Sequence, residues 1–326
     1  MKLTTQQIKN LLFGAAECHE EDGGLQCYRY TRALMEFLRS FWDDWRVRAN
    51  STSGVMLDFY TDSDFFAFSY DKAVKSSSQP GYYFELLING VSTALIGEET
   101  ATTLKGEFSI CLPQGKKRVT LIFPTMFRAR IVSVELSDGA TIERVKKDKN
   151  ILFLGDSITQ GYASKAPSLD YTHRIALSHN CDATNLGIGG AAFDPRLIDE
   201  NVNYHPDVIC VAYGTNDWAK GWAIEKIDGN CRAFFDKLRT QYSTQPIFVI
   251  LPIWRTNYAN ELPSGTLLDV RKRIQDIASS YPNTHIVDLW EEIPHDATLY
   301  TDGLHPNDDG FAYYANGVLK HIGDLL

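Results

Sequence analysis

The sequence has few of the features that mark a metal site, a disulfide scaffold or a membrane anchor. Its six cysteines are spread over 326 residues without a C-x-x-C pair, so neither a zinc site nor a disulfide framework is expected. We therefore expect reduced thiols, no metal and no cofactor. The densest apolar run, residues 247–254, is far too short to span a bilayer, so no membrane partner is expected.

Positive charge is also scarce. The chain has 32 Lys and Arg against 41 Asp and Glu, a formal net charge of −9. No block of basic residues is long enough to follow a phosphate backbone, so nucleic acid is not expected as a partner. The first ten residues lack the apolar stretch of a secretory signal, and we expect a cytoplasmic protein. The sequence makes no prediction of oligomeric state.

Hydrophobic residues make up 44% of the chain, and its length is enough for two domains with different patterns. The first half is rich in short aromatic and β-branched runs separated by turn signals such as Asn89-Gly90, which predicts an antiparallel β-sandwich of the jelly-roll type. A helical segment at residues 30–41, with Leu34, Phe37, Leu38 and Phe41 on one face, precedes it. The expected strands are residues 55–60, 65–70, 82–88, 108–112, 119–123 and 131–136.

A charged segment, residues 146–150, separates this half from one in which strand and helix patterns alternate. Such alternation predicts an α/β domain with a parallel sheet and helices on both faces. We therefore divide the chain into residues 1–146 and 147–326. In the second part the expected strands are residues 151–154, 183–186, 208–213, 247–251 and 286–289, and the expected helices are residues 171–178, 224–242, 267–281 and 310–322.

The segment 151–161, ILFLGDSITQG, is the most informative in the chain. A buried strand ends at Gly155, and Ser157 stands at the turn before a helix, where helix N–H groups favour negative charge. The spacing fits neither a phosphate-binding loop nor a dinucleotide-binding fingerprint, and it differs from G-x-S-x-G because the second glycine comes four residues after the serine. Ser157 is thus either a nucleophile or a simple helix cap.

Polar and glycine residues follow the other expected strands, at the edge of a parallel sheet where chemistry gathers. The pair Asp302-x-x-His305 supplies an imidazole to take the proton of Ser157 and a carboxylate to hold the imidazole tautomer. Backbone N–H groups of Ser157 and Gly190, with the side-chain amide of Asn216, would form an oxyanion hole.

Other residues allow competing interpretations. His295 is the most serious alternative to His305 as the base, although it lacks the Asp-x-x-His spacing. The acidic stretch after His305 lacks the ligand spacing and closing glutamate of a calcium loop, and capping of the last helix by Asn307 or Asp308 explains it better. Trp218, Trp254 and Arg255 follow strand ends, and either line a substrate cleft or pack in the core or at its rim.

At these residues the chain resembles the SGNH (GDSL-type) hydrolases. Their four signature blocks occur in order over residues 150 to 326: the Gly155-Asp156-Ser157 block, the segment 185–190 ending in Gly190, the block containing Asn216, and the Asp302–His305 block. The resemblance implies a flavodoxin-like three-layer α/β/α fold and metal-free ester hydrolysis through an acyl-enzyme. It also implies catalysis by Ser157, His305 and Asp302.

A sandwich ahead of such a domain is similar to the two-domain carbohydrate esterases of family 2. This resemblance in architecture implies removal of small acyl groups, acetyl above all, from a sugar or oligosaccharide. Two alternatives stay open: a lipase-like or thioester-cleaving enzyme for longer acyl chains, and a carbohydrate-binding protein with a degenerate catalytic domain.

Overall fold

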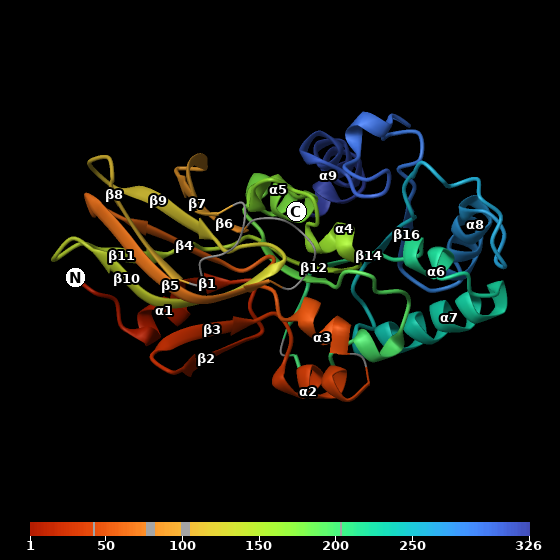
Figure 1. The fold of residues 1–326 in the computed structure, drawn as a ribbon, viewed down its shortest axis with the longest axis horizontal. Helices are drawn as coiled ribbons and strands as arrows, with labels where there is room; N and C mark the ends of the chain where they lie inside the picture. The colour runs from red at the N-terminus through yellow and green to blue at the C-terminus, as the bar shows by residue number, and fades with distance from the viewer. Residues whose placement is uncertain (42, 76–81, 99–104, 203) are drawn as a thin grey trace. The chain divides into compact units, whose positions relative to one another are not determined.

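The computed structural model describes residues 1–41, 43–75, 82–98, 105–202 and 204–326. Within these residues the chain folds as two compact units (Figure 1). The first consists of Met1–Lys147 together with the short segment Ala166–Ser168, and the second of Asp148–Lys165 and Leu169–Leu326. Each unit has its own sheets and its own buried core.

The first unit contains two antiparallel sheets, which confirms the expected β-rich domain. One sheet has the strand order β1-β4-β9-β6-β7, with β11 beside β4, and the other has the order β2-β3-β10-β5-β8. The strands are β1 Leu12–Phe13, β2 Glu17–Glu21, β3 Gly24–Tyr28, β4 Met56–Thr61, β5 Phe65–Lys75, β6 Tyr82–Ile88, β7 Val91–Glu98, β8 Lys105–Cys111, β9 Lys117–Ile122, β10 Phe127–Leu136 and β11 Ile142–Arg144; the helices are α1 Thr5–Leu11, α2 Arg32–Phe41 and α3 Asp43–Ala49.

Aromatic side chains join the two sheets into a sandwich. The ring of Phe84 on β6 lies 5.1 Å from that of Phe68 and 4.8 Å from that of Tyr70, both on β5 of the other sheet. Tyr82 on β6 packs on Phe127 of β10 at 5.3 Å between ring centroids. Each of these rings buries a large apolar area, and their mutual contacts add to the stabilisation that burial supplies.

Two details of this unit follow local chemistry, and one differs from expectation. Asn89 and Gly90 both take positive φ angles, +50° and +80°, as the two-residue turn of a β-hairpin requires. Helix α2 forms where a helical pattern was expected. Phe37, however, is 41% exposed, because it lies at the edge of the apolar face formed by Leu34 and Leu38.

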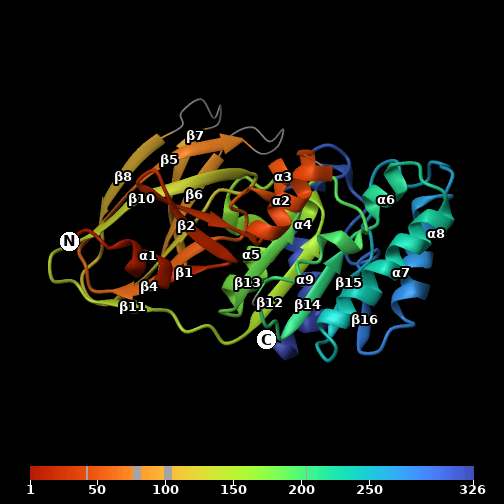
Figure 2. The ribbon, with the colours of Figure 1, turned by 90° about the horizontal axis from the view of Figure 1, so that it is seen from below.

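The second unit contains one parallel sheet in the order β13-β12-β14-β15-β16, the flavodoxin-like order expected for this domain. Helices α5 and α9 share a buried core with one face of the sheet, and α7 and α8 lie side by side (Figure 2). The strands are β12 Asn150–Gly155, β13 Asp182–Gly187, β14 Val208–Ala212, β15 Ile247–Ile250 and β16 Thr284–Val287; the helices are α4 Ser157–Gln160, α5 Tyr171–Ser178, α6 Thr215–Ala219, α7 Ile224–Gln241, α8 Leu267–Ala278 and α9 Asp308–Ile322. Short 3-10 turns occur at Pro167–Leu169, Pro195–Leu197, Ala297–Leu299 and Gly323–Leu325.

The register of this sheet determines where the loops meet. Gly155 at the end of β12 pairs with Gly187 of β13 on one side and with Ala212 of β14 on the other. The residues that follow these three strands therefore leave the sheet at the same edge. Strand β16 begins two residues earlier than expected because the polar residues Thr284 and His285 pair with β15.

Candidate active site

The loop after β12 places the Ser157 side chain at the start of α4. Asp156 is the N-cap residue, and its carboxylate accepts the N–H of Ile158 at 2.9 Å. A side chain at position 155 would come within 2.0 Å of the Thr159 hydroxyl, so only glycine fits there. Gly161 ends the helix in the left-handed conformation, with φ +92°. The G-D-S-x-x-x-G pattern is thus a strand end followed by one capped helical turn.

Ser157, His305 and Asp302 form a continuous chain of hydrogen bonds. The Ser157 Oγ lies 2.8 Å from His305 Nε2, and His305 Nδ1 lies 2.8 Å from Asp302 Oδ2. The other carboxylate oxygen, Asp302 Oδ1, accepts the backbone N–H groups of Leu304 and His305 at 3.1 and 2.9 Å. The Asp302 carboxylate therefore holds both the turn and the imidazole ring. This explains why Asp302 and His305 are three residues apart.

The imidazole of His305 is held in its neutral form by its surroundings. Burial lowers the pKa of His305 and the positive charge of Arg255 lowers it further, while the hydrogen bond and charge of Asp302 oppose both; the net shift is downward. Burial would raise the pKa of Asp302, but hydrogen bonds from His305 and from the Leu304 N–H outweigh it, and that pKa is lowered. At neutral pH the pair is thus a neutral imidazole beside a carboxylate, which suits removal of a proton from Ser157.

Arg255 supplies a pH test of this electrostatic arrangement. His305 accepts a proton only when neutral, so kcat/KM should fall as the pH drops through its pKa. Arg255→Gln removes a positive charge that lowers the pKa of His305, so the acid limb of the profile should move to higher pH. Arg255→Lys keeps the charge and should leave the limb in place. Profiles of kcat/KM against pH for both variants decide this, and a shift in neither, or the same shift in both, contradicts it.

The expected oxyanion residues surround the same loop. Gly190 takes a φ of +77°, and its N–H makes no hydrogen bond to any residue of the described ranges. Lys220 donates to the Gly190 carbonyl, which belongs to the following peptide bond with Ala191, at 2.8 Å. The Asn216 amide donates to the Ala191 carbonyl at 3.0 Å and to Asp156 Oδ2 at 3.3 Å. Asn216 is thus hydrogen-bonded to Asp156, the residue that precedes Ser157.

The three residues considered for substrate contact have different environments. Trp218 is 1% exposed and donates its indole N–H to the Gly265 carbonyl at 3.0 Å, so it packs in the core and does not line a cleft. Trp254 is partly buried, and its ring stacks on His295 at 5.6 Å between centroids. Arg255 is also partly buried and donates to the Thr215 hydroxyl at 3.0 Å. Only Trp254 and Arg255 remain candidates for the substrate side.

The competing interpretations of the neighbouring residues lose support. His295 Nε2 lies 2.8 Å from the Trp290 carbonyl oxygen. The imidazole of His295 also packs between the indoles of Trp254 and Trp290, so His295 is a structural residue. Asn307 caps α9 by accepting the N–H groups of Asp309 and Gly310. In the part of the chain that the structure describes, no cluster of three or more His, Cys, Asp or Glu side chains is arranged to hold a metal ion.

Two further side chains shape the surroundings of the site. Tyr162 packs its ring on that of His305, with 4.4 Å between centroids, and so limits the rotation of the imidazole. Asp217 is wholly buried: its Oδ1 accepts the Phe193 N–H at 3.1 Å, and its Oδ2 has no partner among the described residues. Burial raises the pKa of Asp217 to about 7. The pKa of Asp156 is also raised to about 7, by burial and by the charge of Asp217.

These buried carboxyls predict an unusual dependence of stability on pH. An aspartate of the unfolded chain has a pKa of about 3.9, so between about pH 4 and pH 7 the folded state binds more protons and the free energy of unfolding falls as pH rises. Asp217→Asn removes the charge, so its Tm should exceed that of the wild type at about pH 8, and the gain should shrink toward about pH 5. Asp324→Asn, at an exposed position, is the control. A gain that does not change with pH contradicts the expectation.

Comparisons with known proteins identify one matching family and several similar folds. Residues 153–313 match the GDSL-like lipase/acylhydrolase family. No curated protein matches the sequence. No helix among the described residues is long and apolar enough to cross a membrane.

Several solved structures with similar folds match this chain over nearly its full length. A salicylyl-acyltransferase, SsfX3, from a tetracycline biosynthetic pathway is 23% identical, with a TM-score of 0.83 and 96% of this chain and 94% of that chain covered. A Bacteroides ovatus protein assigned as a GDSL-like lipase is 18% identical, with a TM-score of 0.77 and coverage of 100% and 97%. A family two carbohydrate esterase from Clostridium thermocellum, solved with cellohexaose, is 14% identical, with a TM-score of 0.70 and coverage of 96% and 98%.

Proposed function

We propose that the protein is a carboxylic ester hydrolase whose C-terminal unit, which matches the GDSL-like lipase/acylhydrolase family over residues 153–313, removes small acyl groups from a carbohydrate through an acyl-enzyme on Ser157. The single observation that carries the catalytic assignment is the hydrogen-bonded series Ser157, His305 and Asp302. Such a series activates a hydroxyl that is otherwise a poor nucleophile at neutral pH.

In the proposed mechanism each residue has one task. Ser157 Oγ attacks the ester carbonyl while His305 Nε2 takes its proton. His305 then donates that proton to the leaving alcohol, and in the second half it activates the water that cleaves the acyl-enzyme. Asp302 holds Nδ1–H of the ring and stabilises the imidazolium that forms in each half.

The negative charge on the carbonyl oxygen needs donors beside Ser157. We assign this task to the N–H groups of Ser157 and Gly190 and to the Asn216 amide. The free Gly190 N–H supports this assignment, whereas the Asn216 amide must give up one of its present acceptors to donate to substrate. Loss of one such donor typically lowers kcat about 10²- to 10³-fold.

A carbohydrate ester is the substrate class that the structural likenesses favour. The family two carbohydrate esterases of Clostridium thermocellum and Cellvibrio japonicus share the fold of this chain over both units, and the former was solved with cellohexaose. We assign the partly buried indole of Trp254, next to Arg255 after β15, to contact with a sugar ring. Activity on acetylated oligosaccharides, followed as the loss of acetyl mass, tests this class directly.

Chain length separates the acetyl ester from the lipase-like and thioesterase alternatives. A series of p-nitrophenyl esters with acyl chains of increasing length should show the highest kcat/KM for acetate and a steep fall with longer chains. Higher kcat/KM on long chains, or on acyl thioesters, would favour an acylhydrolase of the lipase or thioesterase type and contradict the acetyl proposal.

Acyl transfer is a second candidate because SsfX3, which has a TM-score of 0.83 to this chain, is described as an acyltransferase. The same acyl-enzyme serves both reactions, since the acyl group passes either to water or to an acceptor hydroxyl. Product analysis in the presence of free sugars and alcohols distinguishes them: release of acetate favours hydrolysis, and acetylated acceptor favours transfer. Failure of a fluorophosphonate probe to label Ser157 would instead favour a binding protein with an inactive hydrolase domain.

A further inference from the structure

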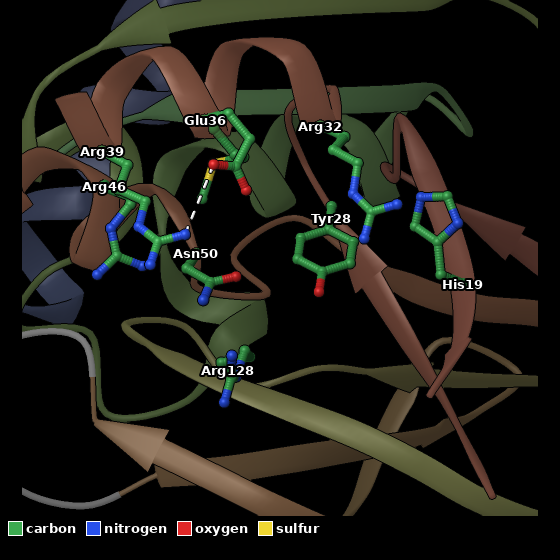
Figure 3. A pocket seen from close by; sticks show the side chains of 9 residues that line it. His19, Tyr28, Arg32, Glu36, Arg39, Arg46, Asn50 and Arg128 are labelled. Carbon is green, nitrogen blue, oxygen red and sulfur yellow. Dashed lines mark ion pairs between the residues drawn. The ribbon is translucent and has the colours of Figure 1, made fainter. Parts of the chain in front are cut away.

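A cavity of about 180 Å³ lies within the N-terminal unit and carries a concentration of positive charge (Figure 3). Of the described residues that line it, four are arginines, Arg32, Arg39, Arg46 and Arg128, and one is an acid, Glu36. These lining residues carry a net positive charge, whereas the chain as a whole has a net charge of −9. Figure 3 shows these side chains coming from α2, α3 and β10 around one hollow.

Glu36 is the one acidic residue among the described residues that line the cavity. Arg32, Glu36 and Arg39 are four and three residues apart on α2, so they share one face of the helix. Glu36 forms an ion pair with Arg39 at 3.6 Å, but both side chains are about two-thirds exposed, and such pairs contribute little. The positive charges of Arg32 and Arg128 both act to lower the pKa of Tyr28, which burial and the hydrogen bond to Glu21 raise to about 12.

The walls of the cavity are held in place by a buried arginine outside it. Arg29 is 1% exposed and donates to the carbonyls of Ser51 at 2.9 Å and Ala49 at 3.1 Å, and to the Ser51 hydroxyl at 3.1 Å. These carbonyls lie at the C-terminal end of α3, where a positive charge is favourable. The contacts fix the end of the helix that carries Arg46 and Asn50, so the cavity is formed before any ligand enters.

Two buried polar atoms in the cavity wall lack partners. Arg128 Nε and Asn50 Oδ1 make no hydrogen bond to any residue in the described ranges. Burying a polar group without a hydrogen bond costs free energy, so native proteins rarely leave such atoms unpaired. One of the two is a donor and the other an acceptor. A ligand that satisfies both must present an acceptor to Arg128 and a donor to Asn50, and an oxyanion is the acceptor that a guanidinium group binds best.

We propose that this cavity binds a sugar acid, with its carboxylate on the guanidinium groups and a ring hydroxyl donating to Asn50 Oδ1. Guanidinium pairs with carboxylate through two parallel hydrogen bonds. The rings of His19 and Tyr28, 5.9 Å apart between centroids, form an amphipathic wall against which a sugar ring can pack. The volume equals that of about six waters, more than an oxyanion alone fills. The site contains none of the candidate catalytic residues, so it does not depend on the esterase proposal.

Isothermal titration of the full chain tests the ligand class. D-Glucuronate should bind saturably and more weakly at high salt. Glucose lacks the charge and acetate lacks the hydroxyls, so each should bind about tenfold more weakly or worse. Absence of glucuronate binding would overturn the proposal, and so would binding of inorganic phosphate or acetate that is as tight as that of glucuronate.

Matched variants test the position of the site. Arg32→Gln, at an exposed position on α2, and Asn50→Ala should each weaken glucuronate binding about tenfold, and Asn50→Ala should leave acetate binding unchanged. Arg232→Gln removes the same charge from an exposed position on α7 and should bind glucuronate as the wild type does. Equal weakening by Arg32→Gln and Arg232→Gln would show a general charge effect and contradict the assignment. Circular dichroism and Tm establish that each variant is folded.

Discussion

Ser157→Ala should lower kcat/KM on p-nitrophenyl acetate by at least about 10⁴-fold, because alanine has no hydroxyl with which to form the acyl-enzyme. The Ser157 hydroxyl makes its hydrogen bond to His305 from the first residue of α4, and alanine at that position keeps the helix and the N-cap by Asp156. The variant should therefore fold with a Tm close to that of the wild type. Steady-state kinetics with purified protein measure the effect.

Two further variants separate loss of the nucleophile from general damage. Because the residues of such a series act as one unit, Ser157→Ala, His305→Ala and the double variant should have similar residual activities, far from the product of two independent losses. Ser178→Ala, in α5, is the matched serine control and should retain wild-type activity. Multiplicative losses in the double variant would mean that Ser157 and His305 do not act together.

Asp302→Asn should lower kcat about 10³- to 10⁴-fold without disturbing the fold, a loss of the size expected when the histidine has the wrong tautomer. The asparagine oxygen can still accept the N–H groups of Leu304 and His305, which hold the turn. Its NH₂ group then occupies the place of Oδ2 and donates to His305 Nδ1. The ring must carry its proton on Nε2, where it can no longer accept the proton of Ser157.

The pH profile distinguishes this tautomer effect from simple loss of a charge. Asp302 raises the pKa of His305, so Asp302→Asn should move what remains of the acid limb to lower pH. If Asp302→Asn kept a near wild-type kcat, water or another group would have to orient His305 in its place. The assignment of Asp302 as the acid of the series would then fail. Asp308→Asn, three residues beyond His305, controls for a change of charge in this loop.

Much of the second unit can be predicted from the sequence because its signals are local. Strands β12, β14 and β15 are largely apolar runs, and glycine and polar residues follow β12, β13 and β14. In a parallel sheet the carboxyl ends lie at one edge, so the loops that carry Ser157, Gly190 and Asn216 can be expected close together. The Asp302-x-x-His305 spacing is a separate local signal, and it indicates the partners of Ser157.

The rest depends on contacts between segments far apart in the chain. Strand β2 is polar, with the sequence ECHEE, and β7 is an exposed edge strand, so neither has the alternation that predicts a strand. The same holds in the site: nothing local indicates that Trp218 is buried or that Tyr162 packs on His305. The cavity of arginines is the clearest case, since Arg32, Arg46 and Arg128 meet only after a helix, a second helix and a strand pack together.

The most direct test of the catalytic account is to trap the acyl-enzyme. The protein is mixed with p-nitrophenyl acetate, quenched in acid within the first turnover, digested and analysed by mass spectrometry. The account predicts one added acetyl group, on the peptide that contains Ser157, in the wild type, and none in Ser157→Ala. Acetyl on another residue, or rapid turnover of p-nitrophenyl acetate with no acetylated Ser157 in the wild type, would contradict it.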